Sequence, residues 1–215
     1  METSYRSILE DGINELSLTV PSAKISLLLA YHQLLVKWNK AYNLTAVRNS
    51  REMISRHLLD SLTVAPYLHG NRFIDIGAGA GLPGIVLAIL FPERQFDLLD
   101  SNGKKTRFLF QVKTELGLGN ITIHHSRVEQ LSEEHTYEGI LSRAFASLAD
   151  MVNCSGQLLA DGGQFLAMKG IYPESELKEL SELEKNYTVD ACHSLQVPSD
   201  LSERHLVVIS RSKQP

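Results

Sequence analysis

A glycine-rich loop is the clearest candidate for a ligand-binding site in this 215-residue sequence. It runs from Asp75 through Gly77, Gly79, Gly81 and Gly84, directly after a predicted strand, and an apolar helix is predicted to follow it. Glycines let the backbone turn sharply and approach a ligand closely, and the first turn of a helix presents free N–H groups. Four glycines cost conformational entropy without a gain in packing, so we interpret the segment as a binding loop rather than a plain turn.

Two kinds of ligand fit this loop. Residues 79–84 match the GxGxxG fingerprint of dinucleotide-binding proteins, and Asp100 lies at about the expected distance downstream. S-adenosylmethionine is favoured because the carboxylate of Asp75 could hold its cationic amino group, directly or through water, and would repel a pyrophosphate. Asp100, at the end of the second predicted strand, could accept both ribose hydroxyls of either ligand. The sequence also lacks the YxxxK pair that would serve a reductase.

A second loop, Ser126-Arg127-Val128-Glu129, follows the third predicted strand. In this topology it runs beside the adenine, where Val128 could pack on the ring and Glu129 or a backbone amide could read its edge. Outside this topology Glu129 would be read as a surface residue of a helix.

Motifs that are absent from the sequence limit which substrate atom can act as the nucleophile that accepts the methyl group. Methyl transfer from a sulfonium is an in-line displacement, so the main contribution of the enzyme is positioning. No NPPY or DPPY tetrapeptide is present for an exocyclic amine, and neither cysteine follows a proline or ends a predicted strand, as attack on a pyrimidine ring requires. A ribose hydroxyl needs a base, yet the fourth predicted strand ends in Ser142-Arg143. Guanine N7 fits, because its lone pair is nucleophilic in neutral guanine and no proton has to leave.

Arg143 is the candidate catalytic residue. It could donate to guanine O6 or orient the carboxylate of the cofactor, and the alternative is a surface ion pair. Phe145 could stack on an exposed base, although a core position is favoured. Lys169 ends the fifth predicted strand and Arg204 precedes the last one, so both are expected at the same rim of the site. They could contact phosphates of the substrate, or they could simply be solvated strand ends. His57 lies on an apolar helix face and is interpreted as a core histidine.

These residues need a scaffold of parallel strands joined by helices, and the sequence predicts one. Helix signals include Pro83-Gly84, residues 104–116 followed by Gly117, a Ser147–Asp150 cap, and Pro173-Glu174. The last two β-like runs have no room for a helix between them and must form an antiparallel hairpin. Strands are predicted at residues 72–76, 95–100, 120–125, 139–142, 164–169, 187–197 and 205–211.

The region before the first strand is predicted to be helical. Apolar residues recur at three- and four-residue steps from Ile25 to Asn39 after the start signal Pro21-Ser22, and a further helix is predicted after Ser50. We therefore expect an α/β fold with an N-terminal helical extension over residues 1–68. Residues 69–215 are expected to form a ligand-binding domain with a Rossmann-like, seven-stranded, mostly parallel sheet, as one compact unit.

Charge and composition limit the partners. The net charge of −4 and the pI of about 6.1 exclude nucleic-acid binding through overall charge, so any RNA contact must be local. Candidate patches are Arg48 with Arg51 and Arg56, and a second set that we assign to RNA together with the rim residues. The assigned RNA-binding residues are Lys104, Lys105, Arg107, Arg127, Lys169 and Arg204.

Cys154 and Cys192 lie far apart, form no CxxC motif and predict buried, reduced thiols without a zinc site or any other metal. The first residues carry too many charges for a signal peptide, and no later stretch is long enough to span a membrane. The expected location is the cytoplasm, without membrane contact.

Six segments resemble the RsmG (GidB) family of bacterial 16S rRNA (guanine-N7) methyltransferases, and the resemblance covers nearly the whole chain. The segments are KWNKAYNLTAV (37–47), RHLLDSL (56–62), DIGAGAGLPGIVLAI (75–89), LLDSNGKKTRFL (98–109), SRAFASL (142–148) and RHLVVI (204–209). Ala78 and Ala80 stand where relatives tend to have Ser or Thr and Pro. This exchange of small residues puts nothing in doubt.

The resemblance implies a class I methyltransferase fold, S-adenosylmethionine as the cofactor, and methylation of the guanine conventionally numbered 527 in 16S rRNA. It implies 16S rRNA or the small ribosomal subunit as the partner, with no obligate protein partner. Cofactor contacts carried over by motif are Gly77, Leu82, Val128, Glu129 and Arg143, and the physical interpretation adds Asp75, Gly79, Gly81 and Asp100.

Two other classes of function remain open. A non-catalytic RNA-binding or assembly factor would bind the cofactor without releasing S-adenosylhomocysteine. A nucleotide-dependent oxidoreductase would be stabilised against heat by NAD rather than by S-adenosylmethionine.

Overall fold

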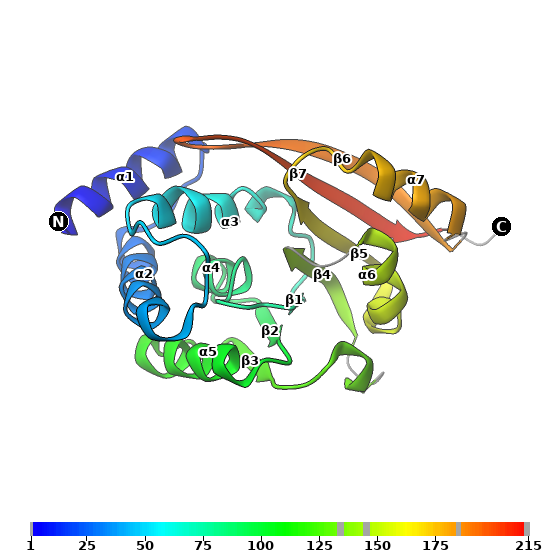
Figure 1. Cartoon of the computed structure of the whole chain (residues 1–215), viewed down its shortest axis with the longest axis horizontal. Helices are drawn as coiled ribbons and strands as arrows, with labels where there is room; N and C mark the ends of the chain where they lie inside the picture. Colours follow the sequence, from blue (N-terminus) through cyan, green and yellow to red (C-terminus); the bar gives the residue numbers. More distant parts are fainter. Residues whose placement is uncertain (1, 133–135, 144–146, 184–185, 213–215) are drawn as a thin grey trace.

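The computed structural model of the chain consists of one twisted sheet with helices on both faces (Figure 1). It describes residues 2–132, 136–143, 147–183 and 186–212. No helix in these ranges is long and apolar enough to cross a membrane.

Seven strands form the sheet in the order β3-β2-β1-β4-β5-β7-β6. The first five strands pair in parallel, and β7 runs antiparallel to both β5 and β6. The strands are β1 Arg72–Ile76, β2 Gln95–Leu99, β3 Ile121–His124, β4 Tyr137–Arg143, β5 Leu159–Lys169, β6 Tyr187–Val197 and β7 Asp200–Arg211. The predicted α/β fold, with its mostly parallel sheet and closing hairpin, is confirmed.

Three strands begin earlier than predicted. β4 starts at Tyr137 rather than at residue 139. β5 starts at Leu159 rather than at residue 164, because Gly162 and Gly163 interrupt the apolar pattern without ending the pairing. β7 starts at Asp200 rather than at residue 205, because only Pro198 and Ser199 connect it to β6. The first residues of β7 are mostly exposed, and Leu201 is the one apolar residue among the first five, so no alternation of apolar residues marks this end of the strand.

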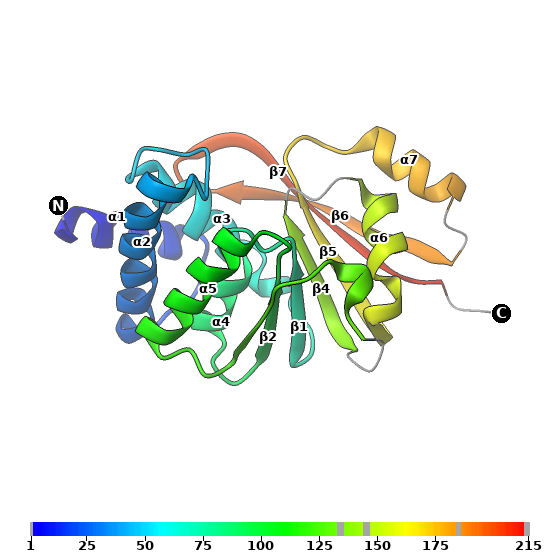
Figure 2. The same cartoon turned by 60° about the horizontal axis from the view of Figure 1, so that its bottom comes forward.

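Helices cover the two faces of the sheet unequally. One core contains Phe73 and Leu98 together with side chains of helices α1, α2, α4 and α5, and the other contains Ile74 and Ile76 together with α6 and α7. Figure 2 shows the two groups of helices on opposite sides of the strands. The helical segments are α1 Glu2–Glu15, α2 Ser22–Tyr42, η1 Ile54–Leu59, α3 Asp60–Leu62, η2 Ala65–Tyr67, α4 Gly84–Leu90, α5 Gly103–Leu116, η3 Val128–Gln130, α6 Leu148–Ser155, η4 Gly156–Leu158 and α7 Glu174–Leu183.

The helix signals in the sequence correspond to real caps. The side chain of Asn102 accepts from the N–H of Lys104, and Gly117 ends α5 in the left-handed conformation, with φ of 64°. The side chain of Ser147 accepts from the N–H of Asp150 at the start of α6. These local contacts explain why α5 and α6 are bounded close to where the sequence predicts them.

The N-terminal helices share a core with the sheet. Leu9 and Leu28 are fully buried in the same cluster as Phe73. Tyr31 of α2 is also fully buried and donates a hydrogen bond of 2.6 Å to the backbone oxygen of Ala80 in the glycine loop. The helical extension therefore supports the loop directly, whereas the boundary predicted at residue 68 stays a prediction.

The order in which strands are added to the sheet reverses between β1 and β4. It moves outward from β1 to β2 and β3, then returns to place β4 on the other side of β1. In open α/β sheets ligands bind outside the carboxyl ends of the strands at such a reversal. This edge holds the glycine loop after β1 and Arg143 at the end of β4.

Replacing Tyr31 by Phe should lower the free energy of unfolding by about 1–2 kcal/mol, because the buried oxygen of Ala80 loses its donor while the ring still fills its space. Urea unfolding followed by circular dichroism measures the change. Tyr172→Phe is the control, since that residue is 52% exposed and its loss of a hydroxyl should change the stability by no more than about 0.5 kcal/mol. Equal midpoints for the two variants would contradict the support assigned to Tyr31.

Candidate functional site

The glycine loop requires its glycines. Gly77, Gly79 and Gly81 have φ of 69°, 59° and 87°, a region that other residues rarely adopt. A side chain at Gly84 would lie 2.2 Å from Leu98 Cδ2, so this position is needed for the close approach of α4 to β2. At Gly79 an added Cβ would meet nothing nearer than 3.7 Å, so the backbone there borders open space. The interpretation as a loop built for close approach is confirmed in its geometry.

The amides of the loop are already used within the protein. The Gly79 N–H donates to Asp100 and the Gly84 N–H donates to Asp75, both at 2.9 Å. Further backbone donors with internal acceptors are Ala78, Gly81, Leu82 and Ile85. A pyrophosphate needs such amides free, so this loop is poorly suited to the dinucleotide suggested by GxGxxG.

Asp75 lies beneath the loop and is 1% exposed. Its Oδ2 accepts from the Gly84 N–H, whereas Oδ1 is buried and has no hydrogen-bond partner among the described residues. Burial raises the pKa of Asp75 to about 7, and the hydrogen bond from Gly84 opposes the shift. A cationic group near Oδ1 would favour the ionised form.

Asp100 is held at the end of β2 by three neighbours. Its Oδ2 accepts from Gly79, its Oδ1 accepts from the Asn102 N–H at 2.8 Å, and Lys105 Nζ lies 3.5 Å from Oδ2. Each carboxylate oxygen has a second lone pair, so the group can still accept from hydroxyls. Lys105, assigned from the sequence to RNA, is instead paired with this carboxylate.

The predicted adenine loop forms the short helix η3. Val128 is 6% exposed and packs in the core with Ile76 and Leu99, while Glu129 is exposed. Both residues lie past β3 at the carboxyl edge of the sheet, as the topology predicts. Their contact with a ligand stays a prediction.

The chemistry of these groups fits S-adenosylmethionine. A buried carboxylate with an unpartnered oxygen suits the cationic amino acid part, and the acceptor Asp100 suits ribose hydroxyls. Most amides of the loop have internal acceptors, which makes the loop less suited to a phosphate. Asp75, Asp100 and the backbone around Gly79 are the groups that would hold the cofactor.

Next to the loop, a cavity of about 360 Å³ opens at the carboxyl ends of β4 and β5. Its lining carries four cationic side chains and one carboxylate, a balance that suits an anionic substrate such as RNA. The lining residues are Thr45, Ala46, Val47, Arg56, His57, Asp60, Arg143, Met168, Lys169, Gly170 and Arg204.

Asp60 organises this cavity, and sequence reasoning missed it. It is 2% exposed, and its two oxygens accept from Arg143 Nη1 at 2.9 Å and from Arg204 Nε at 3.0 Å. Burial raises the pKa of Asp60, and the two arginines oppose the shift. Its signal in the sequence is an acidic residue in the apolar run RHLLDSL, where an unpaired charge would be costly.

His57 is buried, as predicted, but it also lines the cavity. Its Nδ1 lies 2.8 Å from the backbone oxygen of Arg56 and 3.3 Å from Arg143 Nη2. The shorter contact favours a proton on Nδ1, so that Nε2 accepts from the hydroxyl of Thr45 at 2.9 Å. Burial, with the charge of Arg143, lowers the pKa of His57 to about 4. The imidazole is therefore neutral at pH 7, and its lone pair is occupied.

The other predicted residues lie in three kinds of surroundings. Lys169 pairs with Glu176 at 2.7 Å, and Arg204 pairs with both Asp60 and Asp200. Lys104, Arg107 and Arg127 are exposed. Phe145 lies outside the described residues. Cys154 and Cys192 are free thiols, as predicted, but half-buried rather than buried.

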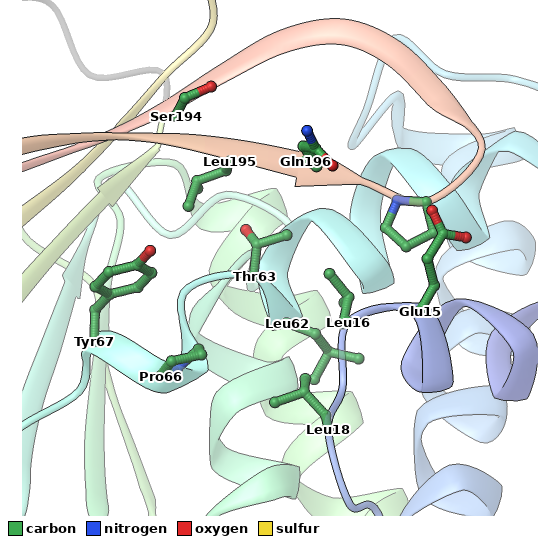
Figure 3. A pocket seen from close by; sticks show the side chains of 11 residues that line it. Glu15, Leu16, Leu18, Leu62, Thr63, Pro66, Tyr67, Ser194, Leu195 and Gln196 are labelled. Carbon is green, nitrogen blue, oxygen red and sulfur yellow. The ribbon is translucent and has the colours of Figure 1, made fainter.

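A second cavity, of about 330 Å³, lies between the end of α1, the segment around α3 and the strand β6 (Figure 3). Among the described residues that line it, Glu15 is the only charged one. It contains none of the predicted site residues, and we assign it no ligand.

Comparison with known proteins agrees with this site. The family model described as GidB, rRNA small subunit methyltransferase G, matches residues 24–207. The ribosomal RNA small subunit methyltransferase G of Stutzerimonas stutzeri (strain A1501) is 50% identical over 211 residues, 97% of each chain. That of Pseudomonas aeruginosa (strain LESB58) is 52% identical, over 94% of this chain and 93% of that protein.

A solved structure gives the same fold at low identity. Magnesium protoporphyrin IX methyltransferase from Synechocystis PCC 6803, with bound SAM, has a TM-score of 0.59 and 14% identity, covering 85% of this chain and 97% of that one. At this identity the likeness shows a class I methyltransferase fold alone. Because the family model and both relatives cover most of its length, the chain belongs to the rRNA small subunit methyltransferase G family.

Proposed function

We propose that this protein transfers the methyl group of S-adenosylmethionine to N7 of a guanine in 16S ribosomal RNA. Membership of the family supports rRNA methylation, and the cationic cavity at the carboxyl edge of the sheet is the observation that carries the proposal. The guanine enters this cavity next to the glycine loop, and the phosphates around it meet the arginines of the rim.

The cavity favours a nucleophile that does not have to lose a proton before or during methyl transfer. Among the described residues lining it, Asp60 has both oxygens occupied by arginines, and the lone pair of His57 is occupied by Thr45. Two arginine charges oppose protonation of Asp60, and its lowered pKa makes His57 a weak base, so neither group is well suited to take a proton from a hydroxyl or an amine. Guanine N7 needs no base, since its lone pair attacks directly.

The cofactor supplies an activated methyl group, which leaves sulfur as the bond to N7 forms, so that the positive charge passes to the guanine ring. Asp75 and Asp100 would orient the cofactor from below the loop. Arg143, fixed by Asp60, would donate to guanine O6 and hold the ring in line with the methyl group. Positioning by these fixed groups is the contribution of the protein.

The direct test uses small ribosomal subunits from cells that lack this gene. The pure protein is incubated with them and labelled S-adenosylmethionine, and methylated nucleotides are mapped by mass spectrometry. One N7-methylguanine in 16S rRNA is the expected result. Normal cofactor binding without transfer would instead favour a non-catalytic assembly factor or a different RNA.

Arg143→Lys should reduce kcat about 10- to 100-fold, because lysine keeps the charge but loses the planar fork that reaches Asp60 and the guanine together. Calorimetry should find the affinity for S-adenosylmethionine within about twofold of wild type. A large loss of cofactor affinity would assign Arg143 to the cofactor carboxylate and overturn its placement against guanine.

The affinity for S-adenosylmethionine should rise with pH up to about 7, because Asp75, with a pKa of about 7, must lose its proton to hold a cation. The expected change is at most about tenfold per pH unit below 7, with release of a proton on binding. Calorimetry at pH 6 and 8, in buffers of different ionisation enthalpy, measures both effects.

Asp75→Asn is the matched control, since it keeps the shape of the side chain and cannot titrate. It should bind the cofactor about 10- to 100-fold more weakly and lose the part of the pH dependence that belongs to Asp75. Any titration of the ligand itself remains in both proteins. If wild type and variant have the same pH dependence, Asp75 does not hold the amino group.

A further inference from the structure

A long segment of this acidic protein carries no acidic residue. Residues 16–51 contain five lysines and arginines and not one Asp or Glu, although the net charge of the chain is −4. The segment includes α2 and the loop after it. Lys37, Lys40, Arg48 and Arg51 are all exposed there. This segment therefore carries a local excess of positive charge, although it holds only five of the 21 lysines and arginines of the chain.

These cations differ from those of the candidate active site. Lys105, Lys169 and Arg204 each pair with a carboxylate. Lys37 and Lys40, one turn apart on α2, form no ion pair with any residue that the structure describes. Unpaired cations are the ones available to phosphate groups.

A cavity of about 440 Å³ is lined by Tyr5 of α1 and by residues of α2 that include these two lysines. Tyr5, His32 and Val36 contribute aromatic and apolar surface, and Ser50 closes it from the loop side. A volume of this order is typical of sites for small ligands. The cavity thus combines a surface for a base with cations for phosphate.

His32 gives this cavity an unsatisfied polar group. It is 1% exposed, and its Nε2 lies 2.7 Å from the backbone oxygen of Ser50, which can only accept. Nε2 therefore carries the proton, and Nδ1 is a bare acceptor. Nδ1 is buried and has no hydrogen-bond partner among the described residues. An N–H donor of a ligand would satisfy it.

The loop after α2 connects this cavity to the candidate active site. Thr45, Ala46 and Val47 line the active-site cavity, and Ser50 lines the cavity beside His32. An RNA strand that places its guanine in the first can therefore continue along this loop to the second.

We propose that the cavity formed by Tyr5, His32, Val36, Lys37 and Lys40 binds a nucleotide of the substrate RNA that flanks the target guanine. The base lies against Tyr5 and Val36 and donates an N–H to His32, while its phosphates contact the two lysines. The proposal rests on the proposed function, because it takes the substrate to be RNA.

The test measures methyl transfer to, and binding of, unmethylated 16S rRNA by the full chain. Lys37→Ala and Lys40→Ala should each raise KM about threefold to tenfold and leave kcat unchanged. The slope of log affinity against log salt should fall by about 0.7 to 1 for each lysine removed. Lys178→Ala is the matched control, since this lysine is 77% exposed on α7, and it should change neither quantity.

His32→Gln tests the acceptor separately. The glutamine amide can still donate to the Ser50 oxygen, but the acceptor at Nδ1 is lost. KM should rise about fivefold, with a melting temperature close to that of wild type, because the amide keeps the hydrogen bond to Ser50 and one unpartnered acceptor replaces another. A merely structural role for His32 would lower the melting temperature and leave KM unchanged.

Salt slopes and KM values equal to those of Lys178→Ala in both lysine variants would overturn the proposal. If wild type transfers no methyl group, but removal of each lysine still lowers the salt slope of RNA binding as predicted, the proposed function fails and the RNA site stands. If transfer is normal in wild type and in all variants, the RNA site fails and the proposed function stands.

Discussion

The carboxylate of Asp60, buried between two arginines, joins the parts of this protein that are distant in sequence. Asp60 comes from the helical region before the sheet, Arg143 ends β4, and Arg204 lies on the closing hairpin. A buried charge is costly unless it is paired, so these three segments must meet at this point. All three residues line the cavity at the carboxyl ends of β4 and β5.

This arrangement also defines the electrostatics of the cavity. Asp60 neutralises part of the arginine charge and fixes the direction in which each guanidinium points, while the cavity as a whole stays cationic. His57 is kept neutral by burial and by the nearby arginine. Among the described residues that line it, the donors are fixed and the two candidate bases are weak, which suits a nucleophile such as guanine N7 that attacks without losing a proton.

The cofactor side is built differently, from backbone conformation. Gly77, Gly79 and Gly81 adopt the left-handed conformation, and the amides of Gly79 and Gly84 donate to Asp100 and Asp75 inside the protein. Tyr31 holds the loop from the other side through Ala80, which makes the N-terminal helices part of the site. This explains why the GxGxxG pattern here does not indicate a dinucleotide.

Local sequence determined the order of strands and helices, the positions of the caps at Asn102, Gly117 and Ser147, and the glycine loop. Each of these depends on residues close together in the chain, through periodicity, side-chain capping or positive φ. The predicted start of β7 was wrong, because the residues at the tip of the hairpin do not form a buried apolar face that a sequence pattern could indicate. Only the tertiary structure decided which charges are paired. The partners of Asp60 lie 83 and 144 residues away, and His32 and Tyr31 acquired their roles by burial beside distant loops, which no local pattern encodes.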